Sequence, residues 1–399
     1  MVSSASGLEA ILHAALARPT KRAARVDATV VFDAGGDLVF YARLKKGNVA
    51  FGRGRPRKPT TTISADAATL GAVVTGEKSG VQAYLEGKLR ARGSLALALE
   101  LDALFEHDAR APEFPKSHRV HVTLANGEEL ETFHLEAGKP GNPKVILLHG
   151  LGATSTSMLP TFHDLSRDHH VFAVDLPGFG ESSKPLRRYH AMFYARWLER
   201  FFDARSIERA HLIGNSMGGR VALEAALRTP ERVDRLALLA PSLAFRKYRQ
   251  LVPIARLLWP ELALMPLPVT RLQVLLTLKG LFFKPERIAR PAYDAAADEF
   301  LRVFATPRGR IAFFSAAKQI YLEDAHGVRG FWDRLPRLSR PALFLFGDRD
   351  RLVPHSFAAH VRRAVPHATI EVIEDCGHVP QFELPDETHA RIRAFFAQS

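Results

Sequence analysis

One short turn constrains this 399-residue chain more than any other feature. The segment His211-Leu-Ile-Gly214-Asn215-Ser216-Met217-Gly218-Gly219 places G-x-S-x-G between an apolar run, expected to be a buried strand, and Val221–Arg228, expected to be a helix. Small residues let such a helix pack close to its strand, and the sharp turn exposes the serine hydroxyl. The free N–H groups and the positive dipole end at the helix N-terminus would also stabilise negative charge that develops near the serine. The pattern predicts a nucleophilic Ser216; a glycine-rich turn without chemistry is the alternative interpretation.

The rest of the C-terminal two thirds indicates a layered fold of alternating strands and helices. Its expected strands have continuous rather than alternating apolar runs, as is typical of strands buried on both faces. Strands alternating with helices predict an α/β domain with a mostly parallel, doubly wound sheet. These runs are Val145–Leu148, Val171–Val174, Ala210–Ile213, Leu236–Leu239, Ala342–Phe346 and Thr369–Ile373, and a hairpin around Asn126-Gly127 precedes them.

A long insertion interrupts this alternation. About 100 mostly helix-prone residues separate Leu239 from Ala342, which is too long for a connecting loop. We therefore expect a helical cap at about residues 244–340.

Backbone N–H groups near the serine are expected to form an oxyanion hole. The run Leu147-Leu148-His149-Gly150-Leu151-Gly152-Ala153 ends an earlier strand. An N–H from Leu151, paired with that of Met217 after the nucleophile, would stabilise a developing oxyanion. The sequence leaves open whether Leu151 or Gly152 donates, and an ordinary strand-end turn is the alternative.

Two later strand ends carry an acid and a base. Gly347-Asp348-Arg349-Asp350 offers two carboxylates, of which Asp350 is expected to orient a histidine and to stabilise it when protonated. Asp348 is expected to form the turn or to pair with Arg351. The chain has 17 histidines, but His378 follows the last strand in a glycine turn, at the sheet edge where open α/β sheets bind ligands. The order Ser216, Asp350, His378 predicts a catalytic triad.

Residues 116–399 resemble the α/β-hydrolase family. The resemblance rests on the oxyanion strand, the Gly214–Gly219 elbow, Gly347-x-x-Asp350, Gly377-His378, and Asp175-Leu-Pro-Gly178-Phe-Gly180. It implies Ser216 as nucleophile, His378 as base and Asp350 as acid, with the Asp175–Gly180 segment a structural loop. A serine at the elbow argues against epoxide hydrolases and haloalkane dehalogenases. The elbow occurs in esterases, monoacylglycerol-type lipases and carbon–carbon bond hydrolases, and does not choose between them.

Residues 1–115 resemble the sterol-carrier-protein-type lipid-binding domain, a small α+β fold. The likeness rests on the expected strand meander, Thr60-Thr-Thr-Ile63, Leu70–Gly76 and the run from Tyr84 to Leu99. It implies an apolar tunnel for acyl chains or sterols, whereas a filled core without a ligand is the alternative. Arg110–Ser117, which contains two prolines, is expected to be the linker.

The charge distribution points to anionic surfaces. The net charge is +13, and residues 244–340 hold 17 basic against 8 acidic residues. Arg43–Lys58 contains seven basic residues and no acidic one. Contact with anionic lipid headgroups is the functional interpretation and a solvated loop the alternative. We expect no nucleic acid partner, because no recognition helix, zinc-finger spacing or stacking motif accompanies the charge.

Composition limits the location. Cys376 is the single cysteine, which fits a reducing compartment, and the N-terminal residues lack a secretory layout. The apolar stretch Leu251–Phe283 is broken by charges and prolines and is not expected to span a membrane. We expect a cytoplasmic protein with peripheral membrane contact.

The leading functional hypothesis is hydrolysis of acyl esters of lipid-like or other apolar substrates, without cofactor or metal. A carbon–carbon bond hydrolase or perhydrolase on the same fold is one alternative. A lipid carrier with a vestigial hydrolase domain is another. The sequence does not give the acyl length or the oligomeric state.

Overall fold

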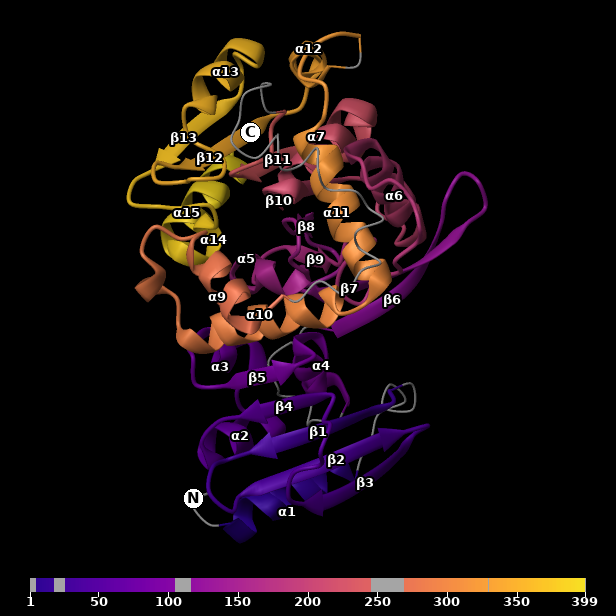
Figure 1. The fold of residues 1–399 in the computed structure, drawn as a ribbon, viewed down its shortest axis with the longest axis vertical. Helices are drawn as coiled ribbons and strands as arrows, with labels where there is room; N and C mark the ends of the chain where they lie inside the picture. Colours follow the sequence, from indigo (N-terminus) through magenta and orange to yellow (C-terminus); the bar gives the residue numbers. More distant parts are fainter. Residues whose placement is uncertain (1–4, 18–25, 105–115, 245–268, 329, 399) are drawn as a thin grey trace. The chain divides into compact units, whose positions relative to one another are not determined.

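A computed structural model describes residues 5–17, 26–104, 116–244, 269–328 and 330–398 (Figure 1). The chain separates into two compact units. The first comprises Met1–Ser117 and Ile288–Glu299, and the second comprises His118–Arg287 and Phe300–Ser399. Each unit is described by itself below.

The first unit is a small α+β fold around a five-stranded sheet. The strands lie in the order β3-β2-β1-β4-β5, and β1 pairs antiparallel with β2 but parallel with β4. Asp66 and Ser79 cap the helices α2 and α3 by accepting hydrogen bonds from backbone N–H groups. The elements are α1 (Ala5–Leu16), β1 (Ala28–Asp33), β2 (Val39–Lys45), β3 (Asn48–Arg53), β4 (Thr61–Ser64), α2 (Ala67–Val74), α3 (Gly80–Leu85), β5 (Arg90–Gly93) and α4 (Leu95–Leu104).

Strand β2 shows why this sheet forms. Its apolar residues Phe40, Ala42 and Leu44 are buried on one face, while Arg43 and Lys45 are exposed on the other. This alternation has the two-residue period of a strand with one face in a core. The expected strand meander is therefore present.

The second unit is built on an eight-stranded sheet with the order β13-β12-β11-β10-β8-β9-β7-β6. Strands β8 to β13 run parallel, and β7 pairs antiparallel with β9. The strands are β6 (Lys116–Thr123), β7 (Glu129–Ala137), β8 (Lys144–Leu148), β9 (His170–Val174), β10 (Ala210–Asn215), β11 (Val233–Leu239), β12 (Ala342–Gly347) and β13 (Thr369–Ile373). The expected parallel sheet is confirmed, and β6 begins at Lys116, inside the segment expected to be a linker; residues 110–115 lie outside the described residues.

Helices pack on this sheet because its central strands are apolar on both faces. Every residue of β9 and β12 is buried. The helix α6 packs against α7, and α5 packs against α14 and α15. The helices are α5 (Leu159–Leu165), α6 (Ala191–Ala204), α7 (Met217–Arg228), α13 (Phe357–Ala364), α14 (Pro380–Glu383) and α15 (Pro385–Phe396).

The insertion between β11 and β12 is helical where the structure describes it. It contains α9 (Arg271–Lys279), α10 (Arg290–Phe304), α11 (Pro307–Tyr321) and α12 (Phe331–Arg334). That this insertion acts as a cap stays a prediction. Most of the apolar stretch Leu251–Phe283 lies outside the described residues. Its described part, residues 269–283, includes α9, in which Leu272 and Leu276 are exposed. Among the helices that the structure describes, none is long and apolar enough to cross a bilayer.

Buried charges connect α7 to the inserted segment. The Arg220 guanidinium donates from Nε to Glu323 at 2.9 Å and from NH1 to Glu224 at 2.8 Å. Arg334 donates to the other side of the Glu224 carboxylate, and Arg220 lies 4.4 Å from the centre of the Phe331 ring. Burial alone would raise the pKa of Glu224, but the two arginines outweigh it and hold that pKa below its usual value.

Replacing Arg220 with methionine should destabilise the second unit strongly. It would leave Glu224 buried with only Arg334, and removing one partner of a buried ion pair costs about 3–5 kcal/mol. Arg200→Met is the control, because Arg200 makes an exposed pair with Asp203 in which both side chains are more than 40% exposed, and such pairs contribute about 0–1 kcal/mol. Chemical denaturation followed by circular dichroism measures both; equal midpoints would show that the cluster contributes little.

Candidate active site

Ser216 lies in a strained turn between β10 and α7. Its backbone has φ 53° and ψ −113°, a conformation that costs a residue with a side chain about 1–3 kcal/mol. Two backbone hydrogen bonds hold it there: Ser216 N–H donates to Leu239 at 3.0 Å, and Arg220 N–H donates to the Ser216 carbonyl at 3.1 Å. The serine side chain is thereby fixed at the carboxyl end of β10, directly before the N-terminus of α7.

Glycines around Ser216 are required by close backbone contacts. A Cβ on Gly214 would lie 2.3 Å from the backbone of Gly218, and a Cβ on Gly218 would lie 2.0 Å from the Leu148 carbonyl oxygen. A Cβ on Gly219 would lie 2.8 Å from Pro241. The first turn of α7 therefore packs directly on β8, β10 and the segment after β11, as the sequence pattern predicts.

His378 and Asp350 form a buried pair at the same sheet edge. His378 Nδ1 lies 2.7 Å from Asp350 Oδ2, and each residue is only 5% exposed. The other carboxylate oxygen of Asp350 accepts from the N–H groups of Leu352 at 2.7 Å and Val353 at 2.9 Å. An ionised carboxylate only accepts hydrogen bonds, so Nδ1 carries the proton and Nε2 is the basic nitrogen.

Asn215 joins the turn of Ser216 to the turn of His378. Its side-chain amide donates to the His378 carbonyl at 3.1 Å and to the Leu239 carbonyl at 3.0 Å. No motif in the sequence predicts a role for this residue. Its position directly before Ser216 is the only feature of the sequence that could have suggested such a role, and that feature is weak.

Glu383 and residues 281–284 also fix the turn that holds His378. Glu383, which is buried, accepts from Gly377 N–H at 2.8 Å and from Lys284 N–H at 2.6 Å. His378 N–H donates to the Leu281 carbonyl at 2.7 Å. A segment of the insertion, residues 281–284, therefore forms part of the wall around His378, which the sequence analysis did not anticipate.

The loop after β8 is held by a neutral histidine. Leu176 N–H donates to His149 Nε2 at 3.0 Å, so Nδ1 must carry the proton that is shared with the Gly150 carbonyl at 2.7 Å. Burial lowers the pKa of His149, and the nearby charge of Asp175 opposes this only in part. A Cβ on Gly150 would lie 3.5 Å from Ser216 Cβ, so this loop borders the serine.

The amides expected to form the oxyanion hole lie at this border. Within the described residues, no hydrogen bond is recorded for the N–H groups of Leu151, Gly152 or Met217. Met217 is the first residue of α7, where helical N–H groups have no intrahelical acceptor. These amides are available to a ligand, and the geometry does not choose between Leu151 and Gly152.

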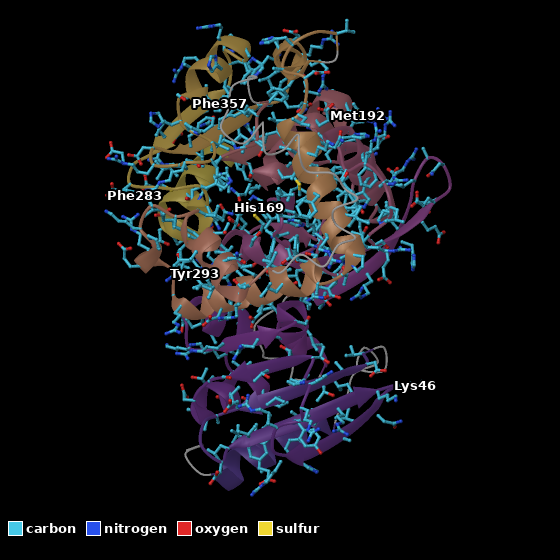
Figure 2. The ribbon with its side chains drawn as sticks, viewed as in Figure 1. Lys46, His169, Met192, Phe283, Tyr293 and Phe357 are labelled. Atoms are coloured by element: carbon cyan, nitrogen blue, oxygen red, sulfur yellow. The ribbon has the colours of Figure 1, made fainter. Side chains whose placement is uncertain are left out.

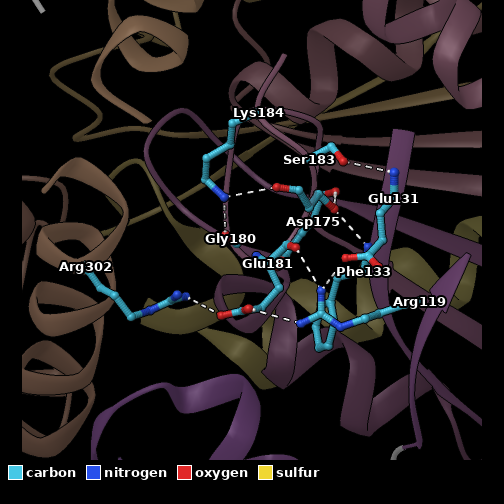
Figure 3. Close-up of polar contacts among 10 residues, drawn as sticks. Arg119, Glu131, Phe133, Asp175, Gly180, Glu181, Ser183, Lys184 and Arg302 are labelled. Atoms are coloured by element: carbon cyan, nitrogen blue, oxygen red, sulfur yellow. Dashed lines mark hydrogen bonds and ion pairs between the residues drawn. The ribbon is translucent and has the colours of Figure 1, made fainter. Parts of the chain in front are cut away.

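The loop after β9 is held by a network of polar contacts around Asp175 and Glu181 (Figure 3). The Asp175 carboxylate accepts from Ser155 N–H at 2.7 Å and from Glu181 N–H at 2.8 Å. Glu181 pairs with Arg119 of β6 at 3.2 Å and with Arg302 of α10 at 2.8 Å. The Asp175–Gly180 segment thus has the structural role implied by the family resemblance.

Two neighbours of the buried pair have structural contacts. Asp348 accepts from Cys376 N–H at 3.2 Å and pairs with Arg349 at 3.1 Å, so its charged partner is Arg349 rather than the expected Arg351. Burial raises the pKa of the Cys376 thiol, which therefore stays protonated beside His378. Within the described residues, no group of three or more His, Cys, Asp or Glu side chains is arranged to hold a metal ion.

Ser242 is a further polar residue at the site. Its hydroxyl oxygen lies 3.3 Å from Ser216 Oγ, and its N–H donates to the Ser216 carbonyl at 2.9 Å. Within the described residues, no hydrogen bond joins Ser216 Oγ to the imidazole of His378. Ser242 follows β11 outside any motif, and only its position just beyond a strand end could have drawn attention to it.

Replacing Gly377 with alanine should destabilise the second unit. The added Cβ would lie 2.5 Å from the Leu281 carbonyl oxygen and 2.7 Å from Phe283 N, and overpacking of this kind costs about 1–3 kcal/mol. Gly141→Ala is the matched control, because nothing lies within 4 Å of its Cβ position. Thermal denaturation compares the two; an unchanged Gly377→Ala transition would mean that residues 281–284 are not held against this turn.

Comparisons with known proteins match two families along the chain. Residues 143–385 match the model of the alpha/beta hydrolase fold family, and residues 9–106 match that of the SCP-2 sterol transfer family. A solved membrane phospholipase A, described as a bacterial virulence factor, is 30% identical, with a TM-score of 0.58 over 70% of this chain and 86% of that chain.

Curated relatives have several activities. A protein of Bacillus subtilis named as an uncharacterized carboxylesterase is 27% identical over 67% of this chain and 83% of its own length. A 2-hydroxy-6-oxononadienedioate/2-hydroxy-6-oxononatrienedioate hydrolase of Pseudomonas sp is 23% identical over 69% of this chain and 96% of its own length. The acetyltransferase component of the acetoin cleaving system of Cupriavidus necator is 28% identical over 63% of each chain, so the chain spans less than two thirds of that relative.

The match to the family model covers more than half of the chain and includes the elbow and both turns of the buried pair. The chain therefore belongs to the α/β-hydrolase family, with a domain of the SCP-2 sterol transfer family at its N-terminus.

Proposed function

We propose that this chain is a serine hydrolase that cleaves carboxylic esters of lipid-like, apolar substrates through an acyl-enzyme. The observation that carries the proposal is the buried His378–Asp350 pair beside the strained turn of Ser216, at one edge of the sheet. In this proposal Ser216 is the nucleophile, His378 the base and Asp350 the acid. The N–H groups of Leu151 and Met217 form the oxyanion hole.

The proposed reaction has two halves. Ser216 Oγ attacks the ester carbonyl carbon while its proton passes to His378 Nε2, and the carbonyl oxygen becomes an oxyanion facing the two N–H groups. His378 then returns the proton to the leaving alcohol as the carbon–oxygen bond breaks. Water, activated by the same nitrogen, hydrolyses the acyl-enzyme. Asp350 stays ionised throughout and stabilises the imidazolium.

Aromatic side chains beside the oxyanion loop support an apolar substrate. A Cβ on Gly152 would lie 2.9 Å from the Phe313 ring and 3.1 Å from the Phe300 ring. These rings form a cluster with Phe304 and Phe314, with centroid separations of 5.2–5.8 Å. A substrate whose carbonyl reached Leu151 and Gly152 would meet this apolar wall, and the SCP-2 family match is consistent with lipid chemistry.

Two other functions are compatible with the same three residues or with the N-terminal domain. A carbon–carbon bond hydrolase or perhydrolase would use the same three residues, and the Pseudomonas relative favours the former. A lipid carrier with a vestigial hydrolase domain is less well supported, since the serine, the histidine and the carboxylate all remain in place. A panel of p-nitrophenyl esters of graded acyl length, run beside ring-cleavage dienoic acids, separates these functions.

Contact with anionic membranes is a second proposal, carried by the basic hairpin β2–β3 and the loop after it. Arg53 pairs with Glu9, and Arg55 pairs with Asp33. The five other basic residues have no carboxylate partner within the described part of the chain, and all are exposed: Arg43, Lys45, Lys46, Arg57 and Lys58. Lys46 lies at the hairpin tip, where Figure 2 shows its side chain pointing away from the sheet.

Asp350→Asn should reduce ester hydrolysis far more than Asp348→Asn. An amide at position 350 disfavours the Nδ1–H tautomer and leaves the imidazolium unsupported, an effect on the order of 10⁴-fold in serine proteases. At position 348 an amide oxygen still accepts from Cys376 N–H. A fluorophosphonate probe should label the wild type and not Ser216→Ala. Labelling of Ser216→Ala, or a greater loss in Asp348→Asn, would contradict the assignment.

Charge reversal at the hairpin tip should weaken vesicle binding. Each basic residue near an anionic leaflet contributes about 1 kcal/mol, so Lys45→Glu/Lys46→Glu should lower the affinity about tenfold or more. The control is Arg362→Glu/Arg363→Glu, an exposed basic pair on α13 with the same charge change. Co-sedimentation with phosphatidylserine and phosphatidylcholine vesicles at two salt concentrations is the measurement. Equal binding to both lipids, or preferred binding to duplex DNA, would overturn the proposal.

A further inference from the structure

Ser242 is placed against Ser216 by the backbone. Ala240, with φ 43°, donates its N–H to the Leu345 carbonyl at 2.8 Å and turns the chain after β11. Pro241 then packs on Gly219, which has no room for a Cβ. The N–H of Ser242 donates to the Ser216 carbonyl at 2.9 Å, so the two serines are tied together before their side chains are considered.

The two hydroxyls face each other in a confined space. Ser242 is 7% exposed, and its Oγ lies 3.3 Å from Ser216 Oγ. Within the described residues, Ser216 is the partner recorded for the Ser242 hydroxyl. A buried hydroxyl needs a hydrogen-bond partner, so the choice left is which of the two serines donates.

Proton counting distinguishes the two directions. A serine hydroxyl has one proton to donate and two lone pairs that accept. If Ser216 donated to Ser242, its single proton would be engaged there and could not be donated to His378 Nε2. If Ser242 donates to Ser216, the proton of Ser216 is free for Nε2, and the Ser242 hydrogen bond strengthens as negative charge grows on Ser216 Oγ.

We propose that Ser242 is a positioning residue that donates a hydrogen bond to Ser216 Oγ and so directs the proton of the nucleophile toward His378. This inference rests on the proposed function. During attack the O–H bond of Ser216 breaks, its proton goes to His378 Nε2, and its oxygen bonds to the carbonyl carbon. The proton of Ser242 stays on Ser242 throughout, so Ser242 stabilises the attacking oxygen without relaying a proton.

The test is the rate at which a fluorophosphonate labels Ser216 in full-length protein, together with kcat and KM on p-nitrophenyl butyrate. Hydrogen bonds to charged groups contribute enough that Ser242→Ala should lower the labelling rate and kcat about 10- to 100-fold, with KM little changed. Ser242→Thr keeps the hydroxyl and should restore most of the rate. Ser242→Cys, a weaker donor of similar size, should fall between Thr and Ala.

Ser315→Ala is the matched control. Ser315 is also buried, but its hydroxyl accepts from Tyr189 N–H at 3.1 Å and donates to the Arg187 carbonyl at 3.4 Å. Ser315→Ala should leave the labelling rate unchanged. If Ser242 had only a structural role, Ser242→Ala would lower the thermal stability and Ser242→Cys, which fills the same space, would label as fast as Ser242→Thr. Wild-type labelling rates in both Ser242→Ala and Ser242→Cys would overturn the inference for Ser242. Absence of labelling in the wild type would instead overturn the proposed function.

Discussion

The turn at Ser216 is the constraint on which the rest of the second unit depends. A residue with a side chain at φ 53° is unfavourable and persists only where the surroundings hold it. Those surroundings are backbone contacts: α7 lies directly on the carbonyl of Leu148, and the Ser216 N–H is bound by Leu239. Since β8, β10 and β11 are adjacent parallel strands, the sheet itself fixes the serine.

The same backbone contacts bring the other site residues to one edge. Asp350 follows β12 and His378 follows β13, and these strands continue the sheet from β11. Asn215 then joins the turn of the serine to the turn of the histidine through one side-chain amide. The site is therefore held mainly by elements of regular structure, which is the arrangement that keeps reacting groups within narrow limits of position.

The parallel strands and the residues at their carboxyl ends could be predicted from the sequence, because they depend on strand order and on short motifs. The continuous apolar runs identified the parallel strands, because burial on both faces removes the alternation of an exposed strand. Ser216 and Asp350 each follow such a run. His378 follows the edge strand β13, in which Ile373 is buried but Val372 is exposed, so its place was predicted from the glycine turn after the last expected strand. The assignment of these three site residues as a triad stays a prediction, because geometry alone does not measure catalysis.

Contacts between distant segments could not be predicted in this way. Arg220 and Glu224 look like an exposed i,i+4 pair in sequence, yet both are buried and Glu323, 103 residues away, completes the cluster. Ser242 and Leu281 likewise approach the site from segments without a motif. Tertiary packing decides which distant segment covers a given side chain, and a local sequence pattern does not reveal that segment.

Gly152 lies between the proposed oxyanion loop and the aromatic side chains of the insertion. It adopts φ 72°, which favours glycine, and the rings of Phe300 and Phe313 occupy the space that a side chain would need. On one side lie the N–H groups of Leu151 and Gly152, the proposed oxyanion donors, whose positions depend on the backbone. On the other side lie Phe300 of α10 and Phe313 of α11, whose rings contact each other and approach this loop. Because Gly152 has no side chain, the rings reach the backbone of the loop directly, and an ester held by these N–H groups would lie against them.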